Sequence, residues 1–187
     1  MARIERASLW PLEAYARERN AFRARVIEHK RQRTVHLGEH VTLIFEDELT
    51  IRYQIQEMLR IERTFEEAGI QDELDAYNPL VPDGTNLKAT MMIEYPEVAE
   101  RQAALARLKG VEARVWVQVA GGARVYAIAD EDLERENEEK TSAVHFLRFE
   151  LDAQMRKALR CGAGLAIGVD HPQYQAVVEA APAVRAA

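Results

Sequence analysis

Six side chains of this sequence are candidates for binding a metal ion or an anion. They are Glu57, Arg60, Glu62, Asp83, His145 and Arg148. Carboxylate and imidazole groups are metal ligands and proton carriers, and guanidinium groups match the geometry of carboxylate and phosphate. One hypothesis for their chemistry is therefore a metal- or anion-binding enzyme with its site between a central helix and a sheet.

The position of Glu62 is unusual for a carboxylate. On a helical wheel of about 100° per residue, it falls near the middle of an apolar arc formed by Ile51, Ile55, Met58, Ile61 and Phe65. A carboxylate on an apolar face is costly unless it is paired, protonated or bound to a metal ion. Either Glu62 lies near solvent at the end of its helix, or a partner holds it in place.

His36 and His40 could bind one metal ion together only if a tight turn at Gly38-Glu39 brought them close to each other. His36 and His40 are four residues apart, which in a strand separates them by about 13 Å, too far for one ion. His145 shares strand parity with apolar neighbours, so we expect it to point toward the core. There it is either a core histidine with a satisfied hydrogen bond or a metal ligand together with Glu57 or Glu62. The sequence contains no glycine-rich phosphate loop, nucleophile elbow or cysteine pair.

A long charged helix is expected to position the first three candidates. The segment 47–68 has helical periodicity, with Asp47 as its N-cap and Gly69 as its stop. An earlier helix is expected to break at Asn20, because an unbroken helix would place both Arg19 and Arg23 on its apolar stripe.

Segments of alternating polarity predict the strands. They are residues 35–45, 87–95, 111–119, 124–128, 143–151 and 165–169. The expected fold class is α+β, with an antiparallel or mixed sheet of about five to six strands and helices packed mainly on one face. We expect a single domain over residues 1–175 and a disordered Ala-rich tail over residues 176–187.

Composition limits the classes of function. The 187 residues suit one domain with a sizeable core, since 48% are hydrophobic. A net charge of −6 argues against nucleic-acid binding, and no segment approaches the roughly 18 apolar residues of a membrane helix. One cysteine, Cys161, allows no internal disulfide. We therefore expect a cytoplasmic protein that binds neither nucleic acid nor membranes.

The charge is distributed unevenly along the chain. Residues 1–40 contain nine Lys/Arg and five Asp/Glu, whereas residues 41–100 contain four Lys/Arg and fourteen Asp/Glu. Such asymmetry is typical of a basic arm that reaches an acidic partner or the acidic half of its own chain. An ordinary solvated basic helix explains the first segment equally simply.

Four stretches of the chain together resemble one bacterial family. They are residues 37–46, 53–60, 77–84 and 144–149, and the string Tyr-Gln-Ile-Gln-Glu-Met-Leu-Arg in the second is the most specific. These stretches are similar to the family catalogued as domain of unknown function three-five-zero-one. The resemblance covers about residues 4–174.

The resemblance implies a biological setting and no mechanism. No activity is established for the family, so no catalytic residue or cofactor is implied. Its members are often encoded beside a rubrerythrin-like protein and an iron–sulfur oxidoreductase, which implies a role near redox metabolism. The leading hypothesis is therefore a non-catalytic accessory or adaptor protein that forms a homodimer and works with a redox partner. The enzyme described above is the alternative.

Overall fold

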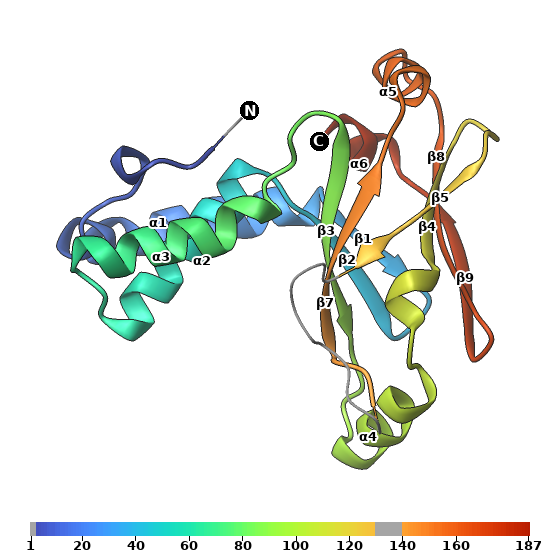
Figure 1. The fold of residues 1–187 in the computed structure, drawn as a ribbon, viewed down its shortest axis with the longest axis horizontal. Coiled ribbons are helices and arrows are strands. Elements are labelled where there is room, and N and C mark those ends of the chain that lie inside the picture. Colours follow the sequence, from blue (N-terminus) through green and yellow to red (C-terminus); the bar gives the residue numbers. More distant parts are fainter. Residues whose placement is uncertain (1–2, 130–139) are drawn as a thin grey trace. The chain divides into compact units, whose positions relative to one another are not determined.

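The computed structural model describes residues 3–129 and 140–187. These residues have the α+β class that the sequence predicts, with six α-helices and two antiparallel sheets (Figure 1). The chain divides into two compact units, a helical unit of Met1–Gln32 and Glu46–Gly84, and a sheet unit of Arg33–Phe45 and Thr85–Ala187. The single domain over residues 1–175 stays a prediction, since compact units need not fold separately.

Three helices form the helical unit. They are α1 (Leu12–Arg31), α2 (Glu48–Glu62) and α3 (Glu67–Tyr77), with short 3-10 turns η1 (Arg6–Ser8) and η2 (Asn78–Leu80). α2 begins as expected, because the Asp47 side chain accepts a hydrogen bond from Thr50 N at 3.0 Å and the Thr50 hydroxyl accepts one from Asp47 N at 3.0 Å. This capping box satisfies two backbone donors at once.

α2 has two buried faces. Ile51, Ile55 and Leu59 belong to one apolar cluster with residues of α3. On another face, Leu49 and Tyr53 pack against buried residues of α1. Burial against both neighbours explains why this helix is stable although it is rich in charge.

The predicted break of α1 at Asn20 is wrong. The helix continues without interruption from Leu12 to Arg31. Arg19, one of the two arginines whose charge was the reason to expect a break, forms an ion pair with Glu57 of α2. A charged residue is tolerated on a helix face that contacts another helix when its charge is paired.

The predicted helix over residues 47–68 is shorter than expected. α2 ends at Glu62 because Arg63 adopts a left-handed conformation with φ of 55°, and Thr64 N donates to Leu59 O at 2.9 Å. This is the hydrogen bond of a Schellman motif, here formed without glycine. Gly69, the expected stop, lies inside α3.

The sheet unit contains two antiparallel sheets. The first has the order β1-β2-β3-β7-β6 and the second β5-β4-β8-β9. The strands are β1 (Thr34–Leu37), β2 (Val41–Phe45), β3 (Asn86–Ile93), β4 (Val115–Val119), β5 (Arg124–Tyr126), β6 (Ile128–Ala129), β7 (Val144–Glu150), β8 (Leu165–His171) and β9 (Tyr174–Glu179). The sequence predicts one sheet, whereas the structure has two. The strands divide between them because β5 pairs with β4, while β6, which begins two residues after β5 ends, pairs with β7.

One apolar core fills the space between the two sheets. It contains the alternate residues of β2, β3 and β7 together with those of β4 and β8. The helices α4 (Val98–Arg107), α5 (Ala153–Arg160) and α6 (Pro182–Ala186) and the 3-10 turn η3 (Val111–Arg114) also belong to this unit. α4 and α5 lie at opposite ends of it (Figure 1).

The end of the chain differs from the expected disordered tail over residues 176–187. β9 pairs with β8 along its length, and α6 follows it. Tyr174, Ala176 and Val178 alternate toward the core and pack against it. The Tyr174 hydroxyl also donates to Leu37 O of β1 and accepts from His40 N. No helix in the described part of the chain is long and apolar enough to span a bilayer.

Candidate functional site

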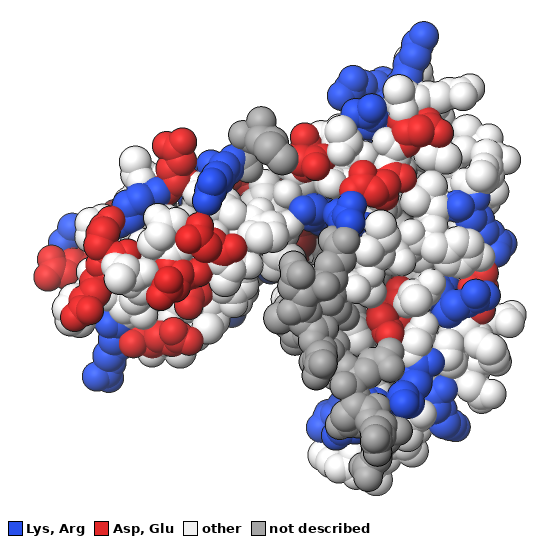
Figure 2. Space-filling view, in the orientation of Figure 1, with Lys and Arg blue, Asp and Glu red and all other residues white. Residues whose placement is uncertain are grey.

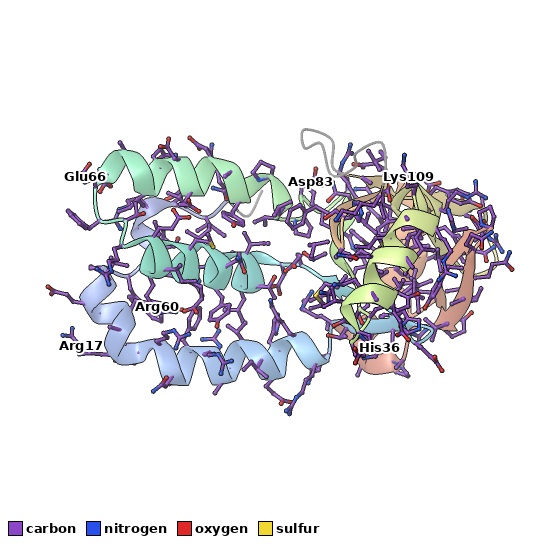
Figure 3. The ribbon with its side chains drawn as sticks, turned by 90° about the horizontal axis from the view of Figure 1, so that it is seen from below. Arg17, His36, Arg60, Glu66, Asp83 and Lys109 are labelled. Atoms are coloured by element: carbon purple, nitrogen blue, oxygen red, sulfur yellow. The ribbon has the colours of Figure 1, made fainter. Side chains whose placement is uncertain are left out.

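Glu57 lies at the centre of a polar network in the helical unit. Arg19 of α1 donates to both carboxylate oxygens, from Nε to Oε1 at 2.7 Å and from Nη2 to Oε2 at 2.8 Å. The hydroxyl of buried Tyr15 donates to Oε1 at 2.7 Å. Arg60 Nη2 lies 3.5 Å from Oε2, and Figure 3 shows Arg60 extending from α2 on the side of α1. The network joins the two helices.

The network also fixes the ionisation of its members. The hydrogen bonds from Arg19 hold the pKa of Glu57 at about 2, despite partial burial that favours the protonated form. Burial and the bond to Glu57 raise the pKa of Tyr15 above its usual value, and the bond to Glu57 raises the pKa of Arg19. At neutral pH all three groups therefore keep one protonation state. A general acid or base needs a pKa near the working pH, which Glu57 does not have.

Glu62 lies in solvent at the end of α2, the first of the two arrangements that its position allows. It is exposed, and its apolar neighbours Ile61 and Phe65 are 62% and 76% exposed. The apolar arc on the helical wheel thus continues past Leu59, the last residue of α2 that is buried in the cluster with α3. Burial, followed by the charges of Glu62 and Asp72, raises the pKa of Glu73. These carboxylates are close enough to repel one another.

We name Ile61, Glu62, Phe65, Asp72 and Glu73 the acidic–apolar surface. Residues 62–75 contain six Asp/Glu and one Lys/Arg, and Figure 2 shows acidic side chains gathered over the helical unit. Arg3 and Arg6 pair with Asp75 and Glu67. Among the described residues, no cation forms an ion pair with Glu62, Asp72 or Glu73.

His145 is fully buried in the sheet unit. Its Nε2 lies 2.9 Å from the Thr141 hydroxyl oxygen and 3.0 Å from Ser142 O. Since a carbonyl only accepts, Nε2 carries a hydrogen. The Thr141 hydroxyl in turn donates to Glu112 at 3.3 Å. This is the arrangement of a core histidine with satisfied hydrogen bonds.

Arg148 and Asp83 are the remaining candidates. Arg148 pairs with Glu150 of the same strand. Asp83 is half-buried in the loop before β3, and Figure 3 shows it at the end of the helical unit away from Glu66. Of the six candidates, Glu57, Arg60, Glu62 and Asp83 belong to the helical unit, and His145 and Arg148 to the sheet unit. Glu57 and Arg60 are in contact with each other. In residues 3–129 and 140–187, no three His, Cys, Asp or Glu side chains are placed to hold a metal ion.

The sequence-based interpretation missed a groove in the sheet unit. Its volume is about 500 Å³, and it is lined by Glu39, His40, Ile93, Glu94, Tyr95, Pro96 and Arg101. The rings of His40 and Tyr95 are stacked, with centroids 3.8 Å apart and planes at 15°. β2 and β3 pair Val41 with Ile93, which brings the residues just beyond this pair together. That register is the signal that would have located the groove.

Comparisons with known proteins identify the family. The family model described as "Protein of unknown function (DUF3501)" matches residues 3–187. The chain belongs to this family. The resemblance found in the four sequence stretches is thereby confirmed, and the match extends to the last residue of the chain.

One solved structure is similar to this DUF3501 protein over nearly its whole length. It is a crystal structure of a novel protein of unknown function from Burkholderia pseudomallei, with 60% sequence identity and a TM-score of 0.93. The similarity covers 98% of this chain and 95% of that chain. No curated protein matches the sequence. The chemistry of this DUF3501 protein must therefore be argued from its own side chains.

Proposed function

We propose that this DUF3501 protein is a non-catalytic accessory or adaptor protein that binds a redox protein through the acidic–apolar surface. One observation carries the proposal: Ile61 and Phe65, 62% and 76% exposed, lie beside carboxylates that form no ion pair with any described residue. Exposed apolar patches that are rimmed by polar residues are typical of protein interaction sites.

The apolar side chains supply the affinity. Fully burying a side chain such as Ile61 or Phe65 is worth about 1.5–3 kcal/mol, and aromatic anchors dominate the energetics of many interfaces. In the free protein these two side chains contribute little to folding because so much of their surface remains in water. A partner with a complementary apolar pocket would bury them.

The carboxylates of the acidic–apolar surface favour a partner with positive charge. Burial raises the pKa of Glu73, and the charges of Glu62 and Asp72 raise it further, so bringing these charges together is unfavourable. Basic side chains on a partner would relieve the repulsion and steer the encounter. The expected partner therefore has a basic rim around an apolar centre.

The polar network around Glu57 supports a role without catalysis. The ionised carboxylate of Glu57 is paired with Arg19, and the pKa of Glu57 is about 2. Buried His145 has hydrogen-bond partners in the core. The redox nature of the partner rests on the gene neighbourhood that the family resemblance implies. The metal- or anion-binding enzyme, the homodimer and the cytoplasmic location stay predictions.

Co-purification tests the proposal. The tagged chain is co-expressed with a rubrerythrin-like protein and an iron–sulfur oxidoreductase, the two kinds of protein that the family resemblance implies as gene neighbours. We expect one of them to co-elute, identified by mass spectrometry and by its iron absorbance, and to be lost with the double variant Ile61→Ser/Phe65→Ser. Val177→Ser is the matched control, because Val177 is 64% exposed and lies in the sheet unit. Elution of the tagged chain without either protein would contradict the proposal.

A further inference from the structure

We propose that the groove of the sheet unit binds a small zwitterion of the amino-acid class, with one carboxylate, one ammonium group and a flat apolar body. The inference goes beyond the adaptor function and does not depend on it. It rests on three features of the groove: a guanidinium that forms no ion pair with any described residue, two carboxylates, and a stacked aromatic wall.

The size of the groove suits such a ligand. Its volume of about 500 Å³ is within the range of roughly 300–1,000 Å³ that is usual for small-molecule sites. The lining comes from the turn before β2, the last residue of β3 with the segment that follows it, and the helix α4. All of them belong to the sheet unit.

Arg101 supplies the positive charge. Its Nη1 donates to Tyr95 O at 3.2 Å, which holds the guanidinium at the groove. Among the described residues no carboxylate forms an ion pair with it, although the side chain is partly buried. The other N–H groups of a guanidinium form a fork that fits a carboxylate.

Glu39 and Glu94 supply the negative charge. The Glu39 side chain is 92% exposed, and its Oε2 lies 3.9 Å from His40 Nε2. Glu94 is fixed by Thr42, whose hydroxyl donates to Oε2 at 2.6 Å. Two carboxylates lining the same groove disfavour a ligand with several negative charges and favour an ammonium group. Together with Arg101 they match opposite charges on one small molecule.

His40 and Tyr95 form the aromatic wall. The His40 ring is fixed because Nδ1 donates to Glu94 O at 3.0 Å; a carbonyl accepts only, so Nδ1 carries the hydrogen. Burial raises the pKa of Tyr95, and its hydroxyl, which bonds to no described residue, therefore stays protonated as a donor. Stacked rings beside Ile93 and Pro96 favour a flat apolar group.

Titration calorimetry on the full chain with three probes tests the proposal. They are L-phenylalanine, 3-phenylpropionate, which lacks the ammonium group, and phenethylamine, which lacks the carboxylate. We expect L-phenylalanine to bind about tenfold more tightly than either, because only it uses both charged sides of the groove. Tighter binding of 3-phenylpropionate, or no saturable binding of L-phenylalanine, would overturn the proposal.

Variants of Arg101 and Glu39 test which side chain binds the carboxylate and which binds the ammonium group of the ligand. Arg101→Gln should weaken L-phenylalanine about tenfold and leave phenethylamine unchanged, and Arg101→Lys, which keeps the charge without the fork, should have an intermediate effect. Glu39→Gln should weaken both ammonium-bearing probes and spare 3-phenylpropionate. Arg160→Gln is the control, since Arg160 is exposed on α5 and does not line the groove. Native affinity for L-phenylalanine in both Arg101 variants would disprove the assignment.

Discussion

Arg19 and Glu57 form a two-point ion pair between α1 and α2, with the Nε–Oε1 and Nη2–Oε2 distances at 2.7 and 2.8 Å. The pair explains why α1 tolerates an arginine on its inner face. It also explains why Glu57, an attractive catalytic candidate by residue type, is held permanently ionised. The same contact thus accounts for the continuity of α1 and for the ionised state of Glu57.

The variant Glu57→Gln should change the acid stability of the protein. The pKa of Glu57 is about 2 in the folded chain against an ordinary 4.5. The ionised carboxylate therefore stabilises the folded state above about pH 4.5, and this contribution is lost as the pH falls toward 2. In urea unfolding, the difference in free energy of unfolding between the native protein and the variant should shrink as the pH falls from 4.5 toward 2. A difference that does not depend on pH would contradict the network.

The variant Tyr15→Phe should lower the free energy of unfolding by about 1–2 kcal/mol. It removes a buried hydroxyl that donates to the Glu57 carboxylate at 2.7 Å, and hydrogen bonds to charged groups are stronger than neutral ones. Tyr53→Phe is the matched control, because the Tyr53 hydroxyl bonds to no described residue, although its ring packs against Phe22. Equal losses in the two variants, measured by chemical denaturation, would disprove the role of the Tyr15 hydroxyl.

The variant Glu73→Gln should raise the free energy of unfolding at neutral pH. Burial and the charges of Glu62 and Asp72 raise the pKa of Glu73, so its ionised form destabilises the folded state. That cost is present above the raised pKa and disappears below the ordinary pKa of a glutamate, where the carboxyl is protonated in both states. The gain should be about 0.5 kcal/mol or more at pH 7 and absent at pH 3. Glu67→Gln, which breaks an ion pair with Arg6, should give no gain.

The variant Gly168→Ala should destabilise the sheet unit by about 1–3 kcal/mol. A Cβ atom at this position would lie 2.3 Å from the ring of Trp116, the residue of β4 that is paired with Gly168. Gly164→Ala is the control, since the nearest atom to its Cβ would be the end of the Glu179 side chain at 3.7 Å. Similar thermal unfolding of the two variants would contradict the register of β4 and β8.

Local signals predicted the local structure. The start of α2 was predictable because Asp47 caps backbone groups only three residues away. Its end was not, because the left-handed residue is Arg63 and carries no sequence signature. The strand β9 was not predicted, because its segment is rich in Ala and Val and alternates only weakly in polarity. Its pairing with β8 shows that it is a strand.

The candidate site depended on long-range contacts that periodicity cannot provide. Glu57 pairs with a residue 38 positions earlier, and His40 meets Tyr95 only through the register of β2 with β3. Solvent exposure of Glu62 was one of two alternatives that the helical wheel left open. The structure selects it because α2 ends at that residue.

The most direct test of the adaptor proposal is the affinity of the purified chain for the purified redox protein that co-elutes with it. Biolayer interferometry should give saturable binding that weakens as salt increases, because acidic side chains contribute. Ile61→Ser/Phe65→Ser should weaken binding about tenfold or more, and Val177→Ser should leave it unchanged. Native affinity in the double variant would contradict docking through the acidic–apolar surface.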